Sequence, residues 1–320
     1  MDEFQLIDRY FRRIAKSHPD VVLGVGDDAA ILAENAGRQF LVTSDTHVEG
    51  VHFHQNSDPA KIGYRAFASS ASDIVAMGGH ARWASLALTI PNANDHWLKN
   101  FTLGSAQAMD TAGAILIGGD TTSGPLTITW NIIGTIDPGS ALRRNGARDG
   151  DAIFVTGSIG GAAAALALGL TESEPSDKAD ACLAQCYWRP RPRYKFGPKL
   201  VGLASSCIDI SDGLVADLTH IAHASHCGAE IELGKLPIAP DLRQRVGQAR
   251  ASRFASVGGD DYELCFTVSQ WLKSTMLEVV QSEDVQVTEI GSISKEPEVR
   301  IFDASGDLVE IDKPGYQHFV

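Results

Sequence analysis

The stretch AILIGGDTTSGPLTITWNIIGTI, residues 114–136, contains the pattern that decides the fold. Its residues 114–117 predict one strand and residues 126–136 a longer one, and Asp120 lies between them in a Gly-Gly-Asp turn. The glycines leave room for a ligand to come close to the backbone beside a carboxylate. One such segment indicates no more than a turn, because Gly, Asp and Ser are the usual turn residues.

Similar aspartate-bearing segments recur along the chain. Five more lie among Gly, Ser or Thr where a strand is expected to end, at residues 24–28, 43–46, 72–73, 209–213 and 258–261. A seventh, residues 145–151, follows Arg143 and Arg144. Gathered carboxylates repel one another and stay ionised only if cations lie between them. Oxygen ligands beside small residues suit Mg²⁺ with bound phosphates, so the whole set favours a metal and phosphate site over ordinary turns.

The composition fits a globular protein of two domains. At 320 residues the chain exceeds the size at which one core usually suffices, and 44% of its residues are hydrophobic. Its net charge of −13 argues against a nucleic-acid partner, because no basic excess is present to neutralise a phosphate backbone. A small anionic nucleotide still fits an acidic site if divalent metals bridge the two.

Five cysteines lie in the second part of the chain and form no Cys-Xaa-Xaa-Cys pair, which is typical of a reduced cytoplasmic protein. The first residues lack the basic-then-apolar order of a signal peptide. The longest weakly polar run, residues 160–170, is far shorter than the ~20 residues that a membrane span requires. The sequence therefore predicts a soluble, cytoplasmic protein with no membrane partner.

Helices and strands alternate along the chain without the regular spacing of βαβ units. Helices are expected at residues 4–14, 59–78, 94–112, 178–187, 193–204 and 213–226, and strands at residues 21–25, 40–43, 83–90, 114–117, 126–136 and 152–156. This order favours an α+β fold over a doubly wound sheet. A turn-rich stretch, residues 137–151, separates an N-terminal domain (1–137) from a C-terminal domain (150–320).

Common nucleotide-binding motifs are missing from the sequence. The only Gly-Lys pair is in GKL (234–236), where Leu replaces the Ser or Thr that a P-loop needs. Residues 157–161, GSIGG, look like the start of a dinucleotide fingerprint, but the third glycine is misplaced, so we interpret them as a tight strand-to-helix turn. His220, His223 and His226 cannot converge on one metal, because six residues turn a helix face by ~240°.

Asp209 and Asp212 are three residues apart across a strand-to-helix junction, so both can face one ligand. Ser211 and the helix amides there suit anions. As an alternative, Asp212 is only the N-cap of the following helix, which leaves Asp209 unexplained. The segment RPRPR (189–193) is extended by its prolines. The sequence leaves three interpretations of this segment open: a phosphate contact, a contact with a partner subunit, or a solvated linker.

These motifs, in this order, resemble those of the thiamine-monophosphate kinases, a family of the aminoimidazole ribonucleotide synthetase-like superfamily. The motifs are GVGDDAA (24–30), TSDTHVEGVHF (43–53), SDIVAMGG (72–79), GGDTT (118–122), RPRPR (189–193), IDISDGL (208–214), GGDDYELCF (258–266) and GYQHF (315–319). The resemblance implies an enzyme that makes thiamine diphosphate from thiamine monophosphate and ATP. It also implies a homodimer in which the N-terminal sheets pair into a barrel, while the C-terminal domains lie outside and complete the active sites.

The resemblance also assigns roles to individual residues. The implied magnesium ligands are Asp28, Thr43, Ser44, Asp45, Asp73, Asp120, Asp209 and Asp212. The implied ATP contacts are Gly119, Asp120, Arg144 and Ser211, and the implied contacts to thiamine monophosphate are His52, Asp260 and Tyr316. The expected catalytic residues among these are Asp45, Asp120 and Arg144. The family usually has Glu at the position of Asp260, so this carboxylate reaches one methylene less far.

The expected reaction is a direct in-line transfer of the ATP γ-phosphoryl group, assisted by Mg²⁺. A phosphate monoester has a second pKa near ~6, so the acceptor oxygen is already anionic and needs no strong general base. One alternative is another ATP-using enzyme of the superfamily, although no cysteine precedes Cys182 to serve a selenophosphate-synthetase-like activity. A second alternative is a nucleotide-and-metal binding protein without catalysis, which would release no ADP with thiamine monophosphate.

Overall fold

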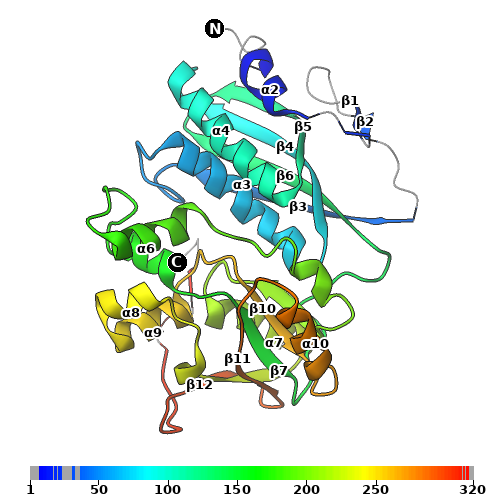
Figure 1. Cartoon of the computed structure of the whole chain (residues 1–320), viewed down its shortest axis with the longest axis vertical. Helices are drawn as coiled ribbons and strands as arrows, with labels where there is room; N and C mark the ends of the chain where they lie inside the picture. The colour runs from blue at the N-terminus through cyan, green and yellow to red at the C-terminus, as the bar shows by residue number, and fades with distance from the viewer. Residues whose placement is uncertain are drawn as a thin grey trace. The chain divides into compact units, whose positions relative to one another are not determined.

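The computed structural model of the chain (Figure 1) describes residues 7–311, except residues 17, 20, 24–30 and 33–36, together with residues 313, 315 and 316. The chain folds into two compact units. Unit 1 consists of Met1–Ile74 and Gly79–Gly139, and unit 2 of Val75–Gly78 and Ser140–Val320. Each unit has a main sheet of its own, four-stranded in unit 1 and six-stranded in unit 2.

The main sheet of unit 1 has the strand order β3-β6-β4-β5. Its strands are β3 (Gln39–Val48), β6 (Thr127–Ile136), β4 (His80–Ile90) and β5 (Ile115–Ser123). β6 is antiparallel to both neighbours, whereas β4 and β5 are parallel. The four strands predicted for this region are confirmed, but β3 continues through residues 43–46 and β5 continues through Gly-Gly-Asp, where these strands are expected to end. A separate short pair, β1 (Val21–Leu23) and β2 (Ile31–Leu32), is antiparallel.

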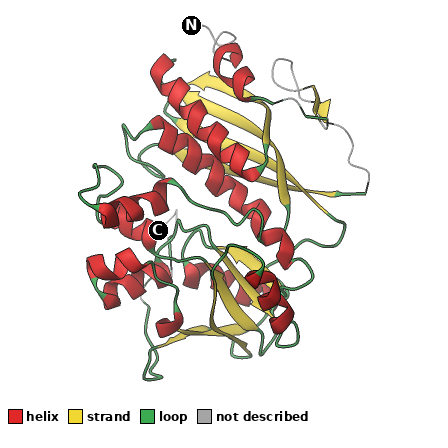
Figure 2. Cartoon of the chain, viewed as in Figure 1, coloured by secondary structure: helices red, strands yellow, loops and turns green. Residues whose placement is uncertain are grey.

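Two long helices, α3 (Pro59–Ala76) and α4 (Asp95–Ala112), cover one face of this sheet (Figure 2). α4 begins where the Asn94 side chain accepts a hydrogen bond from the Trp97 N–H, and it ends at Gly113 in the left-handed conformation. Asp73 lies inside α3, so the expectation that the segment 72–73 follows a strand is wrong. In place of one helix over residues 4–14, the described residues form η1 (Ile7–Phe11) and α2 (Arg12–Ile14).

The edge strand β3 has two different faces, because side chains alternate along a strand. Every second residue from Leu41 to His47 lies on the helix-covered face and is buried or half-buried. On the other face, Phe40 and Val42 expose 51% and 71% of their surfaces. The open face of the sheet is therefore apolar at this edge.

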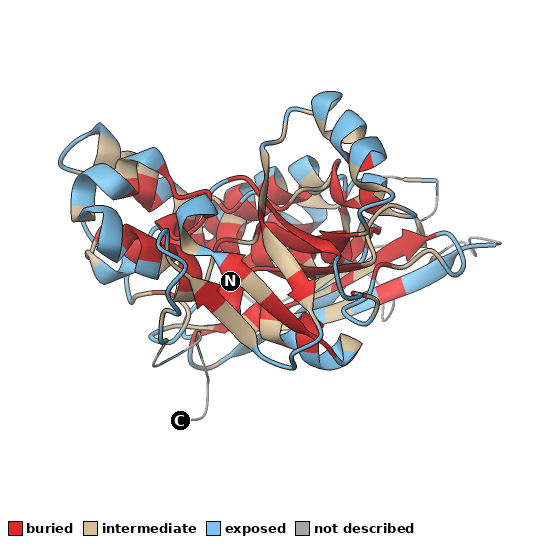
Figure 3. Cartoon of the chain, turned by 90° about the horizontal axis from the view of Figure 1, so that it is seen from below, coloured by how far each residue is buried: buried red, intermediate tan, exposed pale blue. Residues whose placement is uncertain are grey.

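The sheet of unit 2 has the strand order β12-β9-β11-β7-β10-β8. In that order its strands are β12 (Val299–Phe302), β9 (Gly228–Glu232), β11 (Val287–Ser294), β7 (Ala152–Thr156), β10 (Leu264–Val268) and β8 (Ser206–Asp209). All pairs are antiparallel except β12 with β9. β7 and β10 are buried along their whole length, like much of the interior in Figure 3, and Phe154 stacks on Phe266 with ring centroids 5.5 Å apart.

The helices of unit 2 in the described part of the chain are α5 (Gly161–Ala167), α6 (Lys178–Trp188), α7 (Leu214–Ser225), α8 (Pro240–Val246), α9 (Gln248–Val257) and α10 (Lys273–Gln281). Short 3₁₀ turns form at η2 (Gly197–Leu200) and η3 (Leu233–Lys235). The helix predicted over residues 193–204 is wrong, because only η2 forms there, and Pro198 has no N–H to donate within a longer helix. The predicted two-domain α+β fold is confirmed by the mixed sheets and their helices.

Two negative findings hold for the described residues alone. None of their helices is both long and apolar enough to cross a membrane. Neither main sheet closes on itself, since the end strands β3, β5, β12 and β8 each pair with a single named strand. A closed barrel would therefore need strands from a second chain.

Candidate active site

Two carboxylates of unit 1, Asp45 on β3 and Asp73 on α3, lie close together on the helix-covered side of the sheet. The Thr43 hydroxyl donates a hydrogen bond of 2.5 Å to Oδ2 of Asp73. Burial raises the pKa of Asp45 to about 6, the negative charge of Asp73 adds to the rise, and a hydrogen bond with Ser70 opposes it. Two carboxylates that disfavour each other's ionised form make a site at which a divalent cation is favourable.

Ser44 and Asp120 lie away from this carboxylate pair. Ser44 is on the open face of β3, where its hydroxyl donates to Oδ1 of Asn131 at 2.9 Å. Asp120 lies on β5, the other edge strand, and its register with Ala87 places it on the open face as well. Three spacings of ~4.8 Å separate β3 from β5, so within one chain the structure does not bring Asp120 next to Asp45.

The other predicted site residues of unit 1 are His52, Gly119 and Asp28. His52 follows β3, and its Nδ1 accepts a hydrogen bond of 3.0 Å from the Val48 N–H. The proton of the neutral ring is therefore on Nε2. At Gly119 a Cβ would collide with the carbonyl oxygen of Leu86, which explains the glycine. Asp28 lies outside the described residues.

Three predicted site segments that are far apart in the sequence meet in unit 2. The N–H groups of Asp260, Tyr262 and Tyr316 donate to carbonyl oxygens of the loop 210–213, over 2.8, 2.8 and 3.0 Å. Asp209, which precedes this loop at the end of β8, is buried. The strand-to-helix junction, the Gly-Gly-Asp-Asp segment and the C-terminal aromatic residue are therefore neighbours.

The backbone amides of the loop 210–213 point toward a residue to which the motifs assign no role, Asp217 of α7. Its Oδ2 accepts hydrogen bonds from the N–H groups of Ser211, Asp212 and Gly213, over 3.0, 3.1 and 3.1 Å. An internal carboxylate therefore occupies these three loop amides, so they are not offered to a ligand anion. The expectation that the amides of the following helix suit anions stays a prediction. Burial first, and then the charge of Asp212, raise the pKa of Asp217 to about 7 against the opposing effect of the amides.

The two aspartates of the Gly-Gly-Asp-Asp segment have different surroundings. Asp261 is buried, its Oδ2 accepts a hydrogen bond of 2.8 Å from the Gly160 N–H, and burial raises its pKa well above the usual range. Asp260 is half-buried, has a left-handed φ of 72°, and accepts a hydrogen bond of 3.1 Å from the Tyr262 hydroxyl. Asp261 thus shapes the segment from inside, and Asp260 is the more accessible carboxylate.

Arg193, the last residue of the RPRPR segment, forms an ion pair inside unit 2. Its Nε donates to Oε2 of Glu263 at 2.6 Å, and its Nη2 donates to Oε1. The Thr156 hydroxyl donates to the same Oε2 at 2.5 Å. The three interpretations left open by the sequence did not include this internal ion pair.

Residues 157–161 join β7 to α5, which confirms their interpretation as a strand-to-helix turn.

Arg143 and Arg144 are exposed residues of unit 2 whose backbone is anchored. The carbonyl oxygen of Arg143 accepts a hydrogen bond of 3.0 Å from the Cys207 N–H. The carbonyl oxygen of Arg144 accepts a hydrogen bond of 2.9 Å from the Ser225 hydroxyl. Both side chains therefore start from fixed positions at the surface of the unit.

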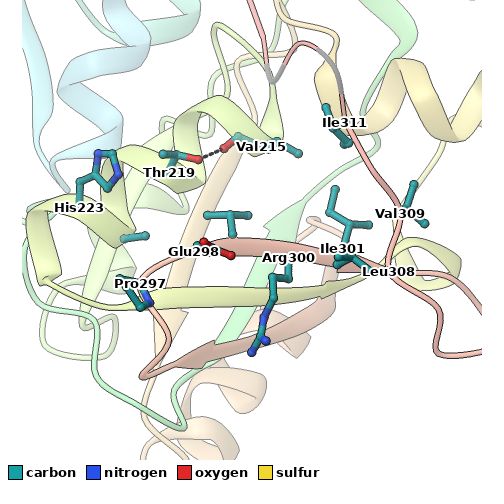
Figure 4. Close-up of a pocket in the computed structure, with 12 residues that line it drawn as sticks. Val215, Thr219, His223, Pro297, Glu298, Arg300, Ile301, Leu308, Val309 and Ile311 are labelled. Atoms are coloured by element: carbon teal, nitrogen blue, oxygen red, sulfur yellow. Dashed lines mark hydrogen bonds between the residues drawn. The ribbon is translucent and has the colours of Figure 1, made fainter.

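A pocket of about 390 Å³ lies between α7 and β12 in unit 2 (Figure 4). Val215, Thr219 and His223 line it from α7, and Arg300 and Ile301 line it from β12. The Thr219 hydroxyl is engaged within the helix, since it donates to the Val215 carbonyl oxygen at 2.6 Å. None of the predicted site residues lines this pocket, so we do not assign it to the site.

Comparison with known proteins covers both units. Residues 26–136 match the AIR synthase related protein, N-terminal domain, and residues 148–304 match the C-terminal domain of that protein. Over 318 residues the chain is 42% identical to the thiamine-monophosphate kinase of Escherichia coli (strain K12), covering 99% of this chain and 98% of that protein. The chain belongs to the thiamine-monophosphate kinase family.

Solved structures with this family's names have the same fold. The thiamine-monophosphate kinase from Stenotrophomonas maltophilia K279a aligns with a TM-score of 0.89 and 38% identity, over 97% of this chain and 98% of that one. A structure described as AaThiL complexed with AMPPCP and TMP aligns with a TM-score of 0.79 and 30% identity, covering 99% of this chain and 97% of that one. The family predicted from the sequence motifs is confirmed.

Proposed function

We propose that this chain transfers the terminal phosphoryl group of ATP to thiamine monophosphate, giving thiamine diphosphate and ADP. Full-length membership of the thiamine-monophosphate kinase family supports this reaction, and the relative described as complexed with AMPPCP and TMP supports both substrates. In this chain the proposal is carried by the neighbouring carboxylates of Asp45 and Asp73. Such an acidic site suits an anionic nucleotide when divalent cations bind with it.

The donor atoms fit Mg²⁺, which prefers hard oxygen ligands. In unit 1 the ligands would be Asp45, Asp73 and Thr43, whose oxygens the fold already brings together. In unit 2 they would be Asp209 and Asp212. When bound, Mg²⁺ supplies positive charge that offsets the charge of the phosphates. Further ligands proposed on the family motifs are Asp28, Ser44 and Asp120.

The transfer proceeds in line, with a phosphate oxygen of thiamine monophosphate as the nucleophile. That oxygen is anionic near neutral pH, so the protein has to align two polyanions and offset their charge instead of removing a proton. Arg144 adds fixed positive charge beside the ATP phosphates. The remaining contacts that we propose are Gly119 and Ser211 for ATP, and His52, Asp260 and Tyr316 for thiamine monophosphate.

An assay of ADP release against a panel of phosphorylated acceptors tests this function. We expect ADP with thiamine monophosphate and Mg²⁺, and none when either is left out. ADP release with another phosphorylated acceptor in place of thiamine monophosphate would assign the chain a different substrate. Nucleotide binding without ADP release from any acceptor would show a binding protein and overturn the proposal.

A homodimer in which two unit 1 sheets close into a barrel is part of the proposal. Among the described strands, β3 and β5 have one neighbour each, so both edges of this sheet are open. Beside the β3 edge, Phe40 and Val42 are largely exposed. Open edges next to exposed apolar side chains favour association with another chain, and a barrel would cover both.

Light scattering during size exclusion tests the dimer. We expect the mass of two chains for the unmodified protein and of one chain for Val42→Asp, since a charge on the open face opposes burial of that face. Leu103→Asp is the matched control, because Leu103 is 52% exposed but lies on α4. A monomeric unmodified protein, or equal masses for the two variants, would contradict the barrel.

A further inference from the structure

We infer that Asp217 is a positioning residue for the loop 210–213, and through that loop for the metal and nucleotide contacts proposed at Asp209, Ser211 and Asp212. The inference rests on the proposed function. Asp217 itself contacts the loop backbone and not the substrate. Its carboxylate fixes the direction in which the loop presents its side chains.

The contacts of Asp217 lock three consecutive peptide groups. The residue is 2% exposed, in the first turn of α7, and a single oxygen accepts the N–H groups of Ser211, Asp212 and Gly213. The orientation of each peptide plane in the loop is therefore set by one side chain.

The other side of the loop backbone is also engaged. Carbonyl oxygens of residues 210–213 accept the N–H groups of Asp260, Tyr262 and Tyr316. Gly213 has a left-handed φ of 126°, and a Cβ there would touch the carbonyl oxygen of Val257. Because these amides and carbonyl groups are satisfied internally, a ligand meets the loop through side chains. The Ser211 hydroxyl and the Asp212 carboxylate are the side-chain groups through which we propose this contact.

A competing role for Asp217 is direct metal coordination. Ligand atoms of Asp212, Asp217 and His220 lie within 4.8 Å of one another. The Asp217 oxygen that accepts three amides has no lone pair left for a metal, because each carboxylate oxygen offers about two, so a coordinating role would fall to the other oxygen. The two roles predict different effects of the same substitutions, which allows a direct test.

Mn²⁺ binding to the full chain, measured by electron paramagnetic resonance, separates the roles. Asp217→Ala removes the acceptor of three amides, and we expect Mn²⁺ affinity to fall about 10- to 100-fold, the usual effect of losing a group that orients metal ligands. Asp217→Asn should bind Mn²⁺ like the unmodified protein, because an amide oxygen accepts the same three hydrogen bonds. The Mg²⁺ concentration that gives half-maximal ADP release should rise in Asp217→Ala and stay unchanged in Asp217→Asn.

If Asp217 were a metal ligand, Asp217→Asn would lose as much affinity as Asp217→Ala, because a neutral amide binds a hard cation poorly. That result would overturn the inference, as would a loss of the same size in His220→Ala. Should Asp217→Ala not fold, Asp217→Glu replaces it. Its carboxylate keeps the charge but lies one methylene away from the amides, so a positioning role still predicts weaker Mn²⁺ binding.

Asp151→Ala is the matched control for loss of a buried carboxylate in unit 2. Oδ2 of Asp151 accepts the Arg148 N–H at 3.0 Å and the Ser205 hydroxyl at 2.6 Å. This variant should unfold at a lower temperature with unchanged Mn²⁺ affinity. Equal losses of affinity in Asp151→Ala and Asp217→Ala would contradict positioning. Failure of the unmodified protein to bind Mn²⁺ or release ADP would instead refute the proposed function.

Discussion

Replacing Arg193 by alanine would leave Glu263 without its cation in a position that is 7% exposed. The Nε hydrogen bond of 2.6 Å and the second bond to Oε1 would be lost, while the Thr156 hydroxyl would stay bound to Oε2. Removal of one partner from a buried ion pair costs about 3–5 kcal/mol. Because the Arg193 side chain is itself 21% exposed, we expect a value near the lower end of that range.

Thermal unfolding followed by circular dichroism measures this loss. For a unit of this size each kcal/mol lowers Tm by about 2–4 °C, so a loss of ~3 kcal/mol predicts a fall of about 6–12 °C. Arg191→Ala is the matched control, because Arg191 is an exposed arginine of the same segment and its loss should cost no more than about 0.5 kcal/mol. Adding Glu263→Gln to Arg193→Ala should recover part of the fall, since the amide needs no cation. Equal Tm values for Arg193→Ala and Arg191→Ala would refute the reasoning.

Asp45→Asn should abolish nearly all ADP release at saturating Mg²⁺ with an unchanged circular dichroism spectrum, because an amide is a poor ligand for a hard cation; near-normal turnover would contradict this. Arg144→Ala should lower kcat/KM for ATP by about 10²-fold and Arg143→Ala should not, so equal kinetics of the two would place Arg144 outside the site. Asp260→Ala should weaken thiamine monophosphate far more than ATP in separate calorimetric titrations, and Asp260→Glu should keep both affinities; an unchanged acceptor affinity in the alanine variant would remove Asp260 from the site. Burial raises the pKa of Asp261, so above the usual carboxyl pKa the folded state holds a proton that the unfolded state has released, and stability falls as pH rises. Asp261→Asn should flatten that fall in Tm above about pH 4, and parallel curves for the two proteins would argue against it.

The sequence predicted where the main strands lie, because apolar runs mark buried segments, but it placed several aspartate-bearing segments wrongly at strand ends. Residues 43–46 lie inside β3, residues 118–122 lie inside β5, and residues 258–261 follow the helix α9. The sequence did not predict the separation of Asp45 from Asp120, since strand order depends on pairing between distant segments. β3 pairs with β6, more than 70 residues later in the chain, and that pairing places β5 at the opposite edge. No local pattern contains this information.

The residues that the sequence missed are those whose partners come from elsewhere in the fold. Asp217 is an ordinary acidic residue in the first turn of a helix, and its role is visible only once the loop 210–213 bends back over it. Likewise, the sequence shows Arg193 only as one of three arginines in an extended arginine-proline segment and indicates no partner for it. Its pairing with Glu263, 70 residues away, depends on the fold and leaves no local pattern in the sequence.

The alternation of β3 also limits how this strand can change in length. Loss or gain of one residue at the start of the strand, before Phe40, would turn every later side chain to the opposite face of the sheet if the pairing with β6 were kept. Phe40 and Val42 would exchange sides with the residues that face α3, and Asp45 would turn away from Asp73. Substitutions at single positions, by contrast, alter one face and leave the other intact. Insertions and deletions within the family are therefore expected in the loops on either side of β3, or in steps of two residues within it.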